Sequence, residues 1–124
     1  MRPPKYDRPG PGEFAPYHEL YVSKVPDGDL LTLMAEQVAQ VRTTLGSLPD
    51  AKAVHAYAPG KWTIKEIIGH ISDAERVFAY RALRIGRADA TPLPGFDENA
   101  WVPPARLDRK STRLNSSHRV ISYA

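Results

Sequence analysis

The chain has 124 residues, of which 42% are hydrophobic and 25% are charged, and it contains no cysteine. This length suffices for one small domain, and the lack of cysteine excludes a disulfide scaffold, a thiolate metal site and a cysteine nucleophile. The net charge of +3 comes entirely from residues 108–124, so residues 1–107 carry no excess charge that would attract nucleic acid. Apolar runs are far shorter than a membrane span and no secretory signal is visible, so we expect a cytoplasmic protein.

The N-terminal segment, residues 1–16, carries five prolines and two glycines. Because proline fixes φ and lacks an amide hydrogen, this segment favours extended and turn conformations and excludes a helix. We expect an arm that is either loose or laid over the body of the protein. Residues 17–22 favour one helical turn that places Tyr17 and Tyr21 on the same face.

The pattern of residues 30–48 predicts a long amphipathic helix. Its apolar residues recur in steps of three and four, which is the spacing of one helix face. Asp29 stands where an N-cap is expected, and Gly46 together with Pro49 marks the end. The apolar stripe consists of Leu30, Met34, Val38, Val41, Leu45 and Leu48.

A second long helix is predicted over residues 64–86, and its start carries the clearest signal in the chain. Thr63 and Glu66 have the spacing of a capping box, in which the hydroxyl and the carboxylate each accept a backbone N–H group. Gly86 is expected to end the helix. The apolar stripe, which Arg81 interrupts, consists of Ile67, Ile71, Ala74, Phe78 and Ile85.

Turns and irregular segments flank the second helix. We expect residues 51–58 to be irregular, and Pro59–Gly60 suits the centre of a type II turn. Prolines exclude a long helix from residues 88–104.

No stretch alternates with a period of two, so the predicted fold class is all-α. Two helices cover only part of their apolar faces, so a bundle of three or more is usual, and this chain ends before supplying the others.

The last residues, 108–124, differ in composition from the rest of the chain. Asp108–His118 contains a single apolar residue and resembles the conceptual translation of a common sequencing adapter, whose continuation gives Ile121–Ala124 after a short index. A disordered basic tail is the alternative. The expected organisation is a proline-rich arm over 1–16, a truncated domain over 17–107 and a non-native tail over 108–124.

His70 is the side chain best suited to bind a metal or to take part in a reaction. Helical spacing places it about 60° from the centre of the apolar stripe. A neutral imidazole there suits zinc, nickel or iron, although position alone favours a hydrogen-bonded histidine at the edge of the core. Glu66 and Asp73 flank it at i−4 and i+3, but the capping box explains Glu66 and a solvated or supporting role explains Asp73. One histidine does not make a metal site, because a catalytic zinc takes about three protein ligands.

The remaining candidate side chains favour structural roles. His18 and His55 lie in irregular segments and are expected at the surface. Trp62 and Phe78 are expected to anchor the core rather than to stack on a ligand. The arginines of the second helix point in different directions and form no stripe for nucleic acid; they are Arg76, Arg81, Arg84 and Arg87.

Residues 57–81 resemble the DinB-like (DinB/YfiT) superfamily, whose recurrent signature is a Trp-Thr-Ile-Lys-Glu block followed by Gly-His. These stand here as Trp62–Glu66 and Gly69–His70. Thr91–Asp97 is similar to the loop after the second helix of that family, and the resemblance covers about residues 13–104. It implies a four-helix bundle, often dimeric, so a homodimer is an expected assembly.

The resemblance also implies a divalent metal, zinc, nickel or iron, held by three histidines, of which His70 matches the first. The other two would lie beyond Leu107, so the chain is expected to hold the first two long helices of an incomplete bundle and to lack tight metal binding and activity. Members with known activity include thiol transferases and a thiol-dependent isomerase, and others are similar to metal-dependent hydrolases. The resemblance therefore implies a small-molecule or thiol substrate for the longer parent. The alternative is a non-catalytic helical module for stress response or dimerisation.

Overall fold

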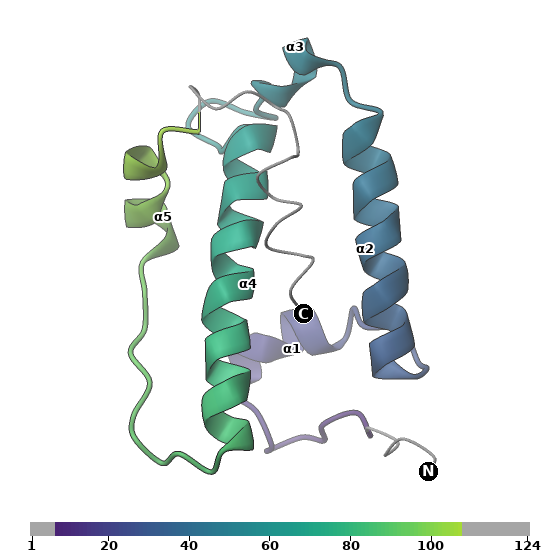
Figure 1. Ribbon diagram of the computed structural model, residues 1–124, viewed down its shortest axis with the longest axis vertical. Helices are drawn as coiled ribbons and strands as arrows, with labels where there is room; N and C mark the ends of the chain where they lie inside the picture. The colour runs from purple at the N-terminus through teal and green to yellow at the C-terminus, as the bar shows by residue number, and fades with distance from the viewer. Residues whose placement is uncertain (1–6, 108–124) are drawn as a thin grey trace. The chain divides into compact units, whose positions relative to one another are not determined.

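The computed structural model describes residues 7–107, and every regular element among them is helical (Figure 1). This confirms the all-α fold class. The chain divides into two compact units, residues 1–47 and residues 48–124. One long helix dominates each unit: α2 spans Leu30–Gly46 in the first, and α4 spans Ile64–Gly86 in the second.

The first unit begins with a short helical stretch. η1 (Pro16–His18) continues directly into α1 (Glu19–Val22). The ring centroids of Tyr17 and Tyr21 lie 5.8 Å apart and their hydroxyl oxygens 3.2 Å apart, so the two side chains share one face as predicted.

α2 begins where the sequence predicts because Asp29 caps it. The Asp29 carboxylate accepts the backbone N–H of Thr32 at 2.9 Å and its hydroxyl at 2.8 Å. Both hydrogen bonds favour the ionised carboxylate, and they hold the pKa of Asp29 below its ordinary value of 3.8. The helix ends at Gly46, slightly before the predicted end at Leu48.

α4 has both of its predicted bounds, and its capping box is formed. The Thr63 hydroxyl oxygen accepts the Glu66 backbone N–H at 3.2 Å, and the Glu66 carboxylate accepts the Thr63 backbone N–H at 2.8 Å. Two of the N–H groups that a helix start leaves without partners are thereby satisfied. The start of α4 is thus set by its own first residues.

The segment between α2 and α4 is more regular than predicted. α3 (Asp50–Ala53) is a single helical turn within a stretch that was expected to be irregular. The predicted turn at Pro59–Gly60 does form, because the Lys61 N–H donates to the Ala58 carbonyl at 3.2 Å and Gly60 has a φ of 72°.

After α4 the chain reverses and runs back along that helix (Figure 1); we call residues 88–107 the return segment. Ala88 makes the reversal with a φ of 54°, in the left-handed region that alanine seldom occupies. No long helix forms in the return segment, as predicted, but two short elements do: α5 (Glu98–Trp101) and η2 (Pro103–Ala105). Asp97 caps α5 by accepting two backbone N–H groups of its first turn.

Few side chains among residues 7–107 are fully buried, and the apolar ones are Ala53 and Val102, at 2% and 7% exposed. Phe78 is 60% exposed, so its prediction as a core anchor is wrong, whereas Trp62 is half-buried. The reason is that the return segment packs on the flank of α4 and not on its apolar stripe. The exposed stripe residues are Ile67, Ile71, Phe78 and Ile85. Within the described part of the chain, no helix has the length and apolar character that a membrane span needs.

Candidate functional site

His70 lies in the N-terminal half of α4 and is half-buried. Its imidazole packs against the indole of Trp62, with ring centroids 5.0 Å apart and an interplanar angle of 46°. Among residues 7–107, the ring makes no hydrogen bond to another residue. His70 is therefore at the edge of the covered surface, as predicted, and within the described part of the chain its contact is with the Trp62 ring rather than with a hydrogen-bond partner.

Glu66, which precedes His70 by one helical turn, is already engaged. Its carboxylate accepts the Thr63 backbone N–H at the start of α4. This hydrogen bond engages one of the two carboxylate oxygens and holds the Glu66 side chain at the helix start. The structure thus confirms the interpretation of Glu66 as part of the capping box.

Asp73, which follows His70 by three residues, is paired on its own helix. Its carboxylate lies 3.2 Å from a guanidinium nitrogen of Arg76. The pair is at the surface, where such ion pairs contribute little to stability. Asp73 is thus engaged in a surface ion pair, and no contact with His70 is seen in the described part of the chain.

The described residues do not fit a metal centre on their own. No group of three or more His, Asp or Glu side chains with suitable geometry occurs among residues 7–107. His18 and His55 are exposed, as predicted. Since a catalytic metal takes about three protein ligands, His70 supplies one donor and the described residues do not complete the set.

The sequence pattern did not predict the packing of the return segment on α4. The Arg81 guanidinium donates to the Pro94 carbonyl at 3.0 Å, and it lies 5.9 Å from the ring centroid of Phe96. Near the other end of this segment, the side chain of Leu107 lies against Gly69. The signal that could have indicated this arrangement is Arg81 itself, a charged residue that interrupts an apolar stripe.

Arg84 holds the bend that starts the return segment. Its guanidinium donates to the Tyr80 hydroxyl at 3.0 Å and to the Thr91 carbonyl at 2.9 Å, and it forms an ion pair with Asp89. The Asp89 carboxylate also accepts the Thr91 backbone N–H at 2.9 Å. This backbone hydrogen bond, followed by contacts from the Thr91 hydroxyl and Arg84, holds the pKa of Asp89 below its ordinary value.

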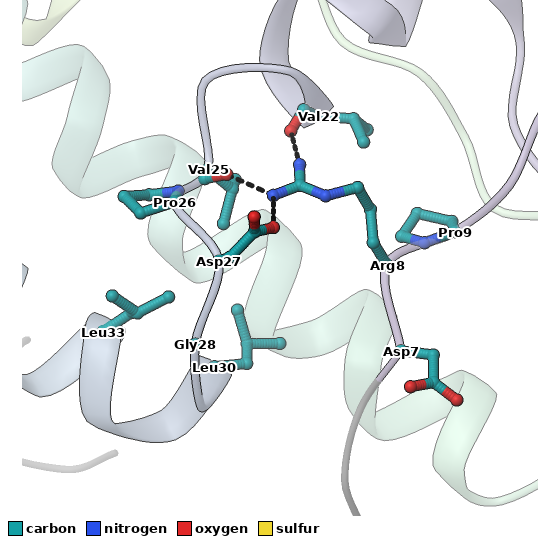
Figure 2. A pocket seen from close by; sticks show the side chains of 10 residues that line it. All are labelled: Asp7, Arg8, Pro9, Val22, Val25, Pro26, Asp27, Gly28, Leu30 and Leu33. Carbon is teal, nitrogen blue, oxygen red and sulfur yellow. Dashed lines mark hydrogen bonds and ion pairs between the residues drawn. The ribbon is translucent and has the colours of Figure 1, made fainter.

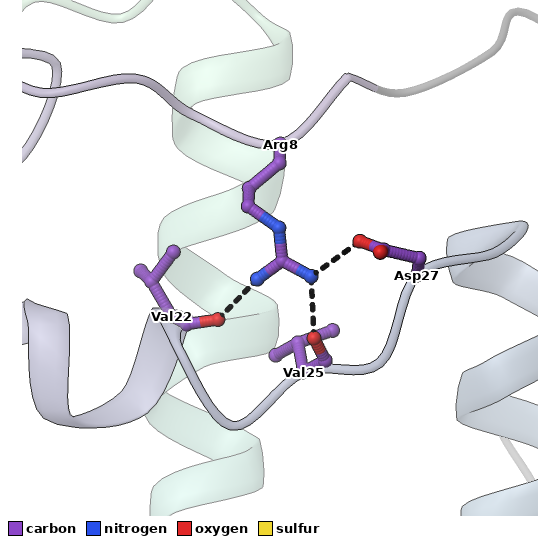
Figure 3. A network of polar contacts seen from close by, with 4 residues as sticks. All are labelled: Arg8, Val22, Val25 and Asp27. Atoms are coloured by element: carbon purple, nitrogen blue, oxygen red, sulfur yellow. Dashed lines mark hydrogen bonds and ion pairs between the residues drawn. The ribbon is translucent and has the colours of Figure 1, made fainter.

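The first unit contains a cavity of about 540 Å³ between the arm, the end of α1 and the start of α2 (Figure 2). Figure 3 shows that the Arg8 guanidinium donates to the carbonyls of Val22 and Val25 and lies 3.0 Å from an Asp27 carboxylate oxygen. The Val22 carbonyl also accepts the Val25 N–H at 3.2 Å, so Arg8 is a second donor to that group and ties the arm to the turn after α1. The described part of the arm therefore lies against the rest of its unit, which is one of the two arrangements expected from the sequence.

Comparisons with known proteins give one family and one curated relative. The family model of the DinB superfamily matches residues 33–118. A protein of Oceanobacillus iheyensis is 28% identical over 87 residues, which cover 64% of this chain and 50% of that protein; its name calls it a metal-dependent hydrolase and marks that activity as provisional. The chain thus spans about half the length of the curated relative that it matches. No solved structure matches the chain.

The adapter-like segment lies outside the described residues, and its origin stays a prediction.

Proposed function

Since the chain belongs to the DinB superfamily, we propose that it is the portion of a metal-dependent enzyme that supplies one metal ligand, His70. The curated relative named as a metal-dependent hydrolase supports metal-dependent chemistry in proteins of this kind. The substrate that we propose for the longer protein is a small molecule or a thiol. A cytoplasmic location and a homodimer belong to the same proposal.

The observation that carries the proposal is the state of the His70 imidazole. It is half-buried on a helix with a well-defined start, an aromatic ring lies against it, and its nitrogens bind no other residue among 7–107. A neutral imidazole in this state is suited to bind zinc, nickel or iron. A divalent metal, when bound, polarises a substrate oxygen or lowers the pKa of bound water or thiol.

The role of the chain's own residues is to position this donor. Thr63 and Glu66 fix the start of α4, and Trp62, which immediately precedes that start, restricts the imidazole. Because the described residues offer one donor of about three, we propose that the remaining ligands come from residues outside 7–107. The 124-residue chain alone is then expected neither to hold metal tightly nor to turn over substrate.

Metal content of the longer protein tests the proposal. We expect the gene, extended at its source locus past Leu107, to encode further histidines and to yield a protein that copurifies with metal. His70→Ala should remove most of that metal, whereas His55→Ala, a change at an exposed histidine, should leave it in place. Equal metal content in the wild-type protein and the His70→Ala variant would contradict the proposal.

A second candidate function is a non-catalytic helical module. It is favoured by the exposed apolar surface of α4 together with the incomplete donor set of the described residues. Such a module would use the same helices for association and would hold no stoichiometric metal. The metal analysis therefore separates the two candidates: a metal-free full-length protein that dimerises supports the module.

A further inference from the structure

The contact between Gly69 and Leu107 has a consequence for the site around His70. A Cβ atom placed on Gly69 would lie 2.9 Å from Cδ2 and 3.1 Å from Cγ of Leu107, and closer still to Cδ1. Real Cβ atoms essentially never approach other atoms more closely than 3.0 Å. A Cβ on residue 69 would therefore force the end of the Leu107 side chain to move from its present place on α4.

Other glycines of the long helices show that this arrangement is particular to Gly69. A Cβ at Gly46 or at Gly86 would meet nothing within 4 Å. Glycine weakens a helix interior relative to alanine, because it costs more backbone entropy and adds no side-chain contact. Gly69 lies inside α4, where glycine weakens the helix. The space that it leaves for the Leu107 side chain is a physical reason for glycine at this position.

The Leu107 contact is one of several that fasten the return segment to α4. Arg81 and Arg84 bind carbonyl groups of its first part, and Val102 is buried in its second part. The Leu107 contact is made at Gly69, the residue that precedes His70, and the His70 imidazole packs against Trp62. The last described residue of the return segment thus meets α4 at the position that precedes the proposed ligand in sequence.

We propose that Gly69 is a positioning residue: it seats Leu107 on α4 and thereby holds residues 103–107 next to the His70 imidazole. This contact limits access to the imidazole. The contact itself is independent of any metal, whereas its importance for a metal ligand rests on the proposed function. Gly69 does not bind metal or substrate, and it acts through Leu107.

Disulfide trapping tests the contact, and a chain without cysteine is well suited to it. We expect the pair Gly69→Cys and Leu107→Cys to oxidise about ten-fold faster in native buffer than the pair Gly86→Cys and Leu107→Cys, because a disulfide needs closely placed Cβ atoms. In guanidinium chloride the 86–107 pair should instead oxidise about two-fold faster than the 69–107 pair, since it closes a shorter loop in the unfolded chain. An 86–107 pair that oxidises as fast as the 69–107 pair in native buffer would overturn the proposal.

Chemical modification of His70 tests the positioning role. Diethyl pyrocarbonate modifies accessible neutral imidazoles, and mass spectrometry separates His70 from the exposed His18 and His55, which serve as internal standards. We expect Gly69→Ala to raise the rate at His70 several-fold relative to those standards, and Gly86→Ala to leave it unchanged. A rate at His70 that does not respond to Gly69→Ala would overturn the positioning role.

Rescue distinguishes displacement of Leu107 from general damage to the helix. In a Leu107→Ala background the atoms that would clash are gone, so adding Gly69→Ala should produce no further increase in the His70 rate. A further increase of the same size would show that Gly69 acts on the helix alone, against the proposal. Neither readout needs metal, so trapping and rescue can succeed while the metal analysis of the longer protein fails, and the reverse can also occur.

Discussion

The two long helices, α2 and α4, have similar sequence patterns but differ in what lies along them inside their own units. α4 carries the return segment, which is fastened at Arg81, Arg84 and Gly69. α2 has a capped start, yet its first apolar residues, including Leu31 and Met34, are exposed. An amphipathic pattern therefore specifies a helix. Whether another segment packs on that helix depends on separate contacts, which the pattern does not encode.

The largest expected effect concerns a property that both helices share, their exposed apolar side chains. Uncovered apolar surface costs roughly 25 cal/mol per Å², so the chain as given should bind a hydrophobic dye and self-associate with increasing concentration. Dye fluorescence and light scattering measure this. Replacing Phe78 and Ile85 by glutamine should reduce both signals, because it removes exposed apolar surface from the stripe of α4. A dye-negative monomer with a sharp cooperative melt would show that the apolar faces of the two helices are covered in solution.

The next effect should separate the two helices. Val102→Asp places a carboxylate at a buried position of the return segment and should destabilise the second unit by roughly 3 kcal/mol. Hydrogen exchange should then show lost protection in α4 while α2 is unchanged. Val54→Asp, at a position that is 58% exposed in the same unit, is the matched control and should have little effect. If α2 lost protection to the same degree, the two units would not be independent.

A smaller effect is expected at the start of α4. Thr63→Ala removes the hydroxyl that accepts the Glu66 N–H and should cost about 1 kcal/mol of local stability. The first turn of α4, measured by hydrogen exchange, should fray. Thr43→Ala removes a hydroxyl that donates to the Ala39 carbonyl within α2 and should be close to neutral. Equal effects from the two changes would argue against a special role for the capping box.

The smallest expected effect is the pH dependence of the start of α2. Because the pKa of Asp29 is lowered in the folded state, its contribution is fully present above the ordinary value of 3.8 and is lost as pH falls through the lower folded value. Hydrogen exchange of the first turn of α2 at acidic pH measures this loss. Asp29→Asn keeps a capping oxygen that does not titrate, so it should flatten the dependence. An unchanged acid response in that variant would place the responsible group elsewhere.

The parts of the fold that could be predicted from sequence are those set by short-range contacts. The bounds of α4 follow from Thr63, Glu66 and Gly86, and the start of α2 follows from Asp29. The single turns α3 and α5 were missed because four residues are too few to show a periodic pattern. Asp97 was nevertheless a usable N-cap signal for α5.

Long-range contacts account for what could not be predicted. Phe78 was expected in the core because it belongs to the apolar stripe, but the covered flank of α4 is selected by guanidinium contacts to the carbonyls of Thr91 and Pro94. The position of His70 beside the covered surface followed from helical spacing, and its contact with Trp62 did not. The fit between Gly69 and Leu107 joins residues far apart in the chain, so no local pattern could reveal it.

The contacts of Arg84 make the bend after α4 a self-contained module. One guanidinium joins a phenol on its own helix, a carboxylate beyond the helix end and a carbonyl farther along, and all of these lie within Tyr80–Thr91. Because no partner from outside this stretch is required for these bonds, the sequence should be transferable. Grafted onto the end of an unrelated helix, it should turn the following chain back along that helix.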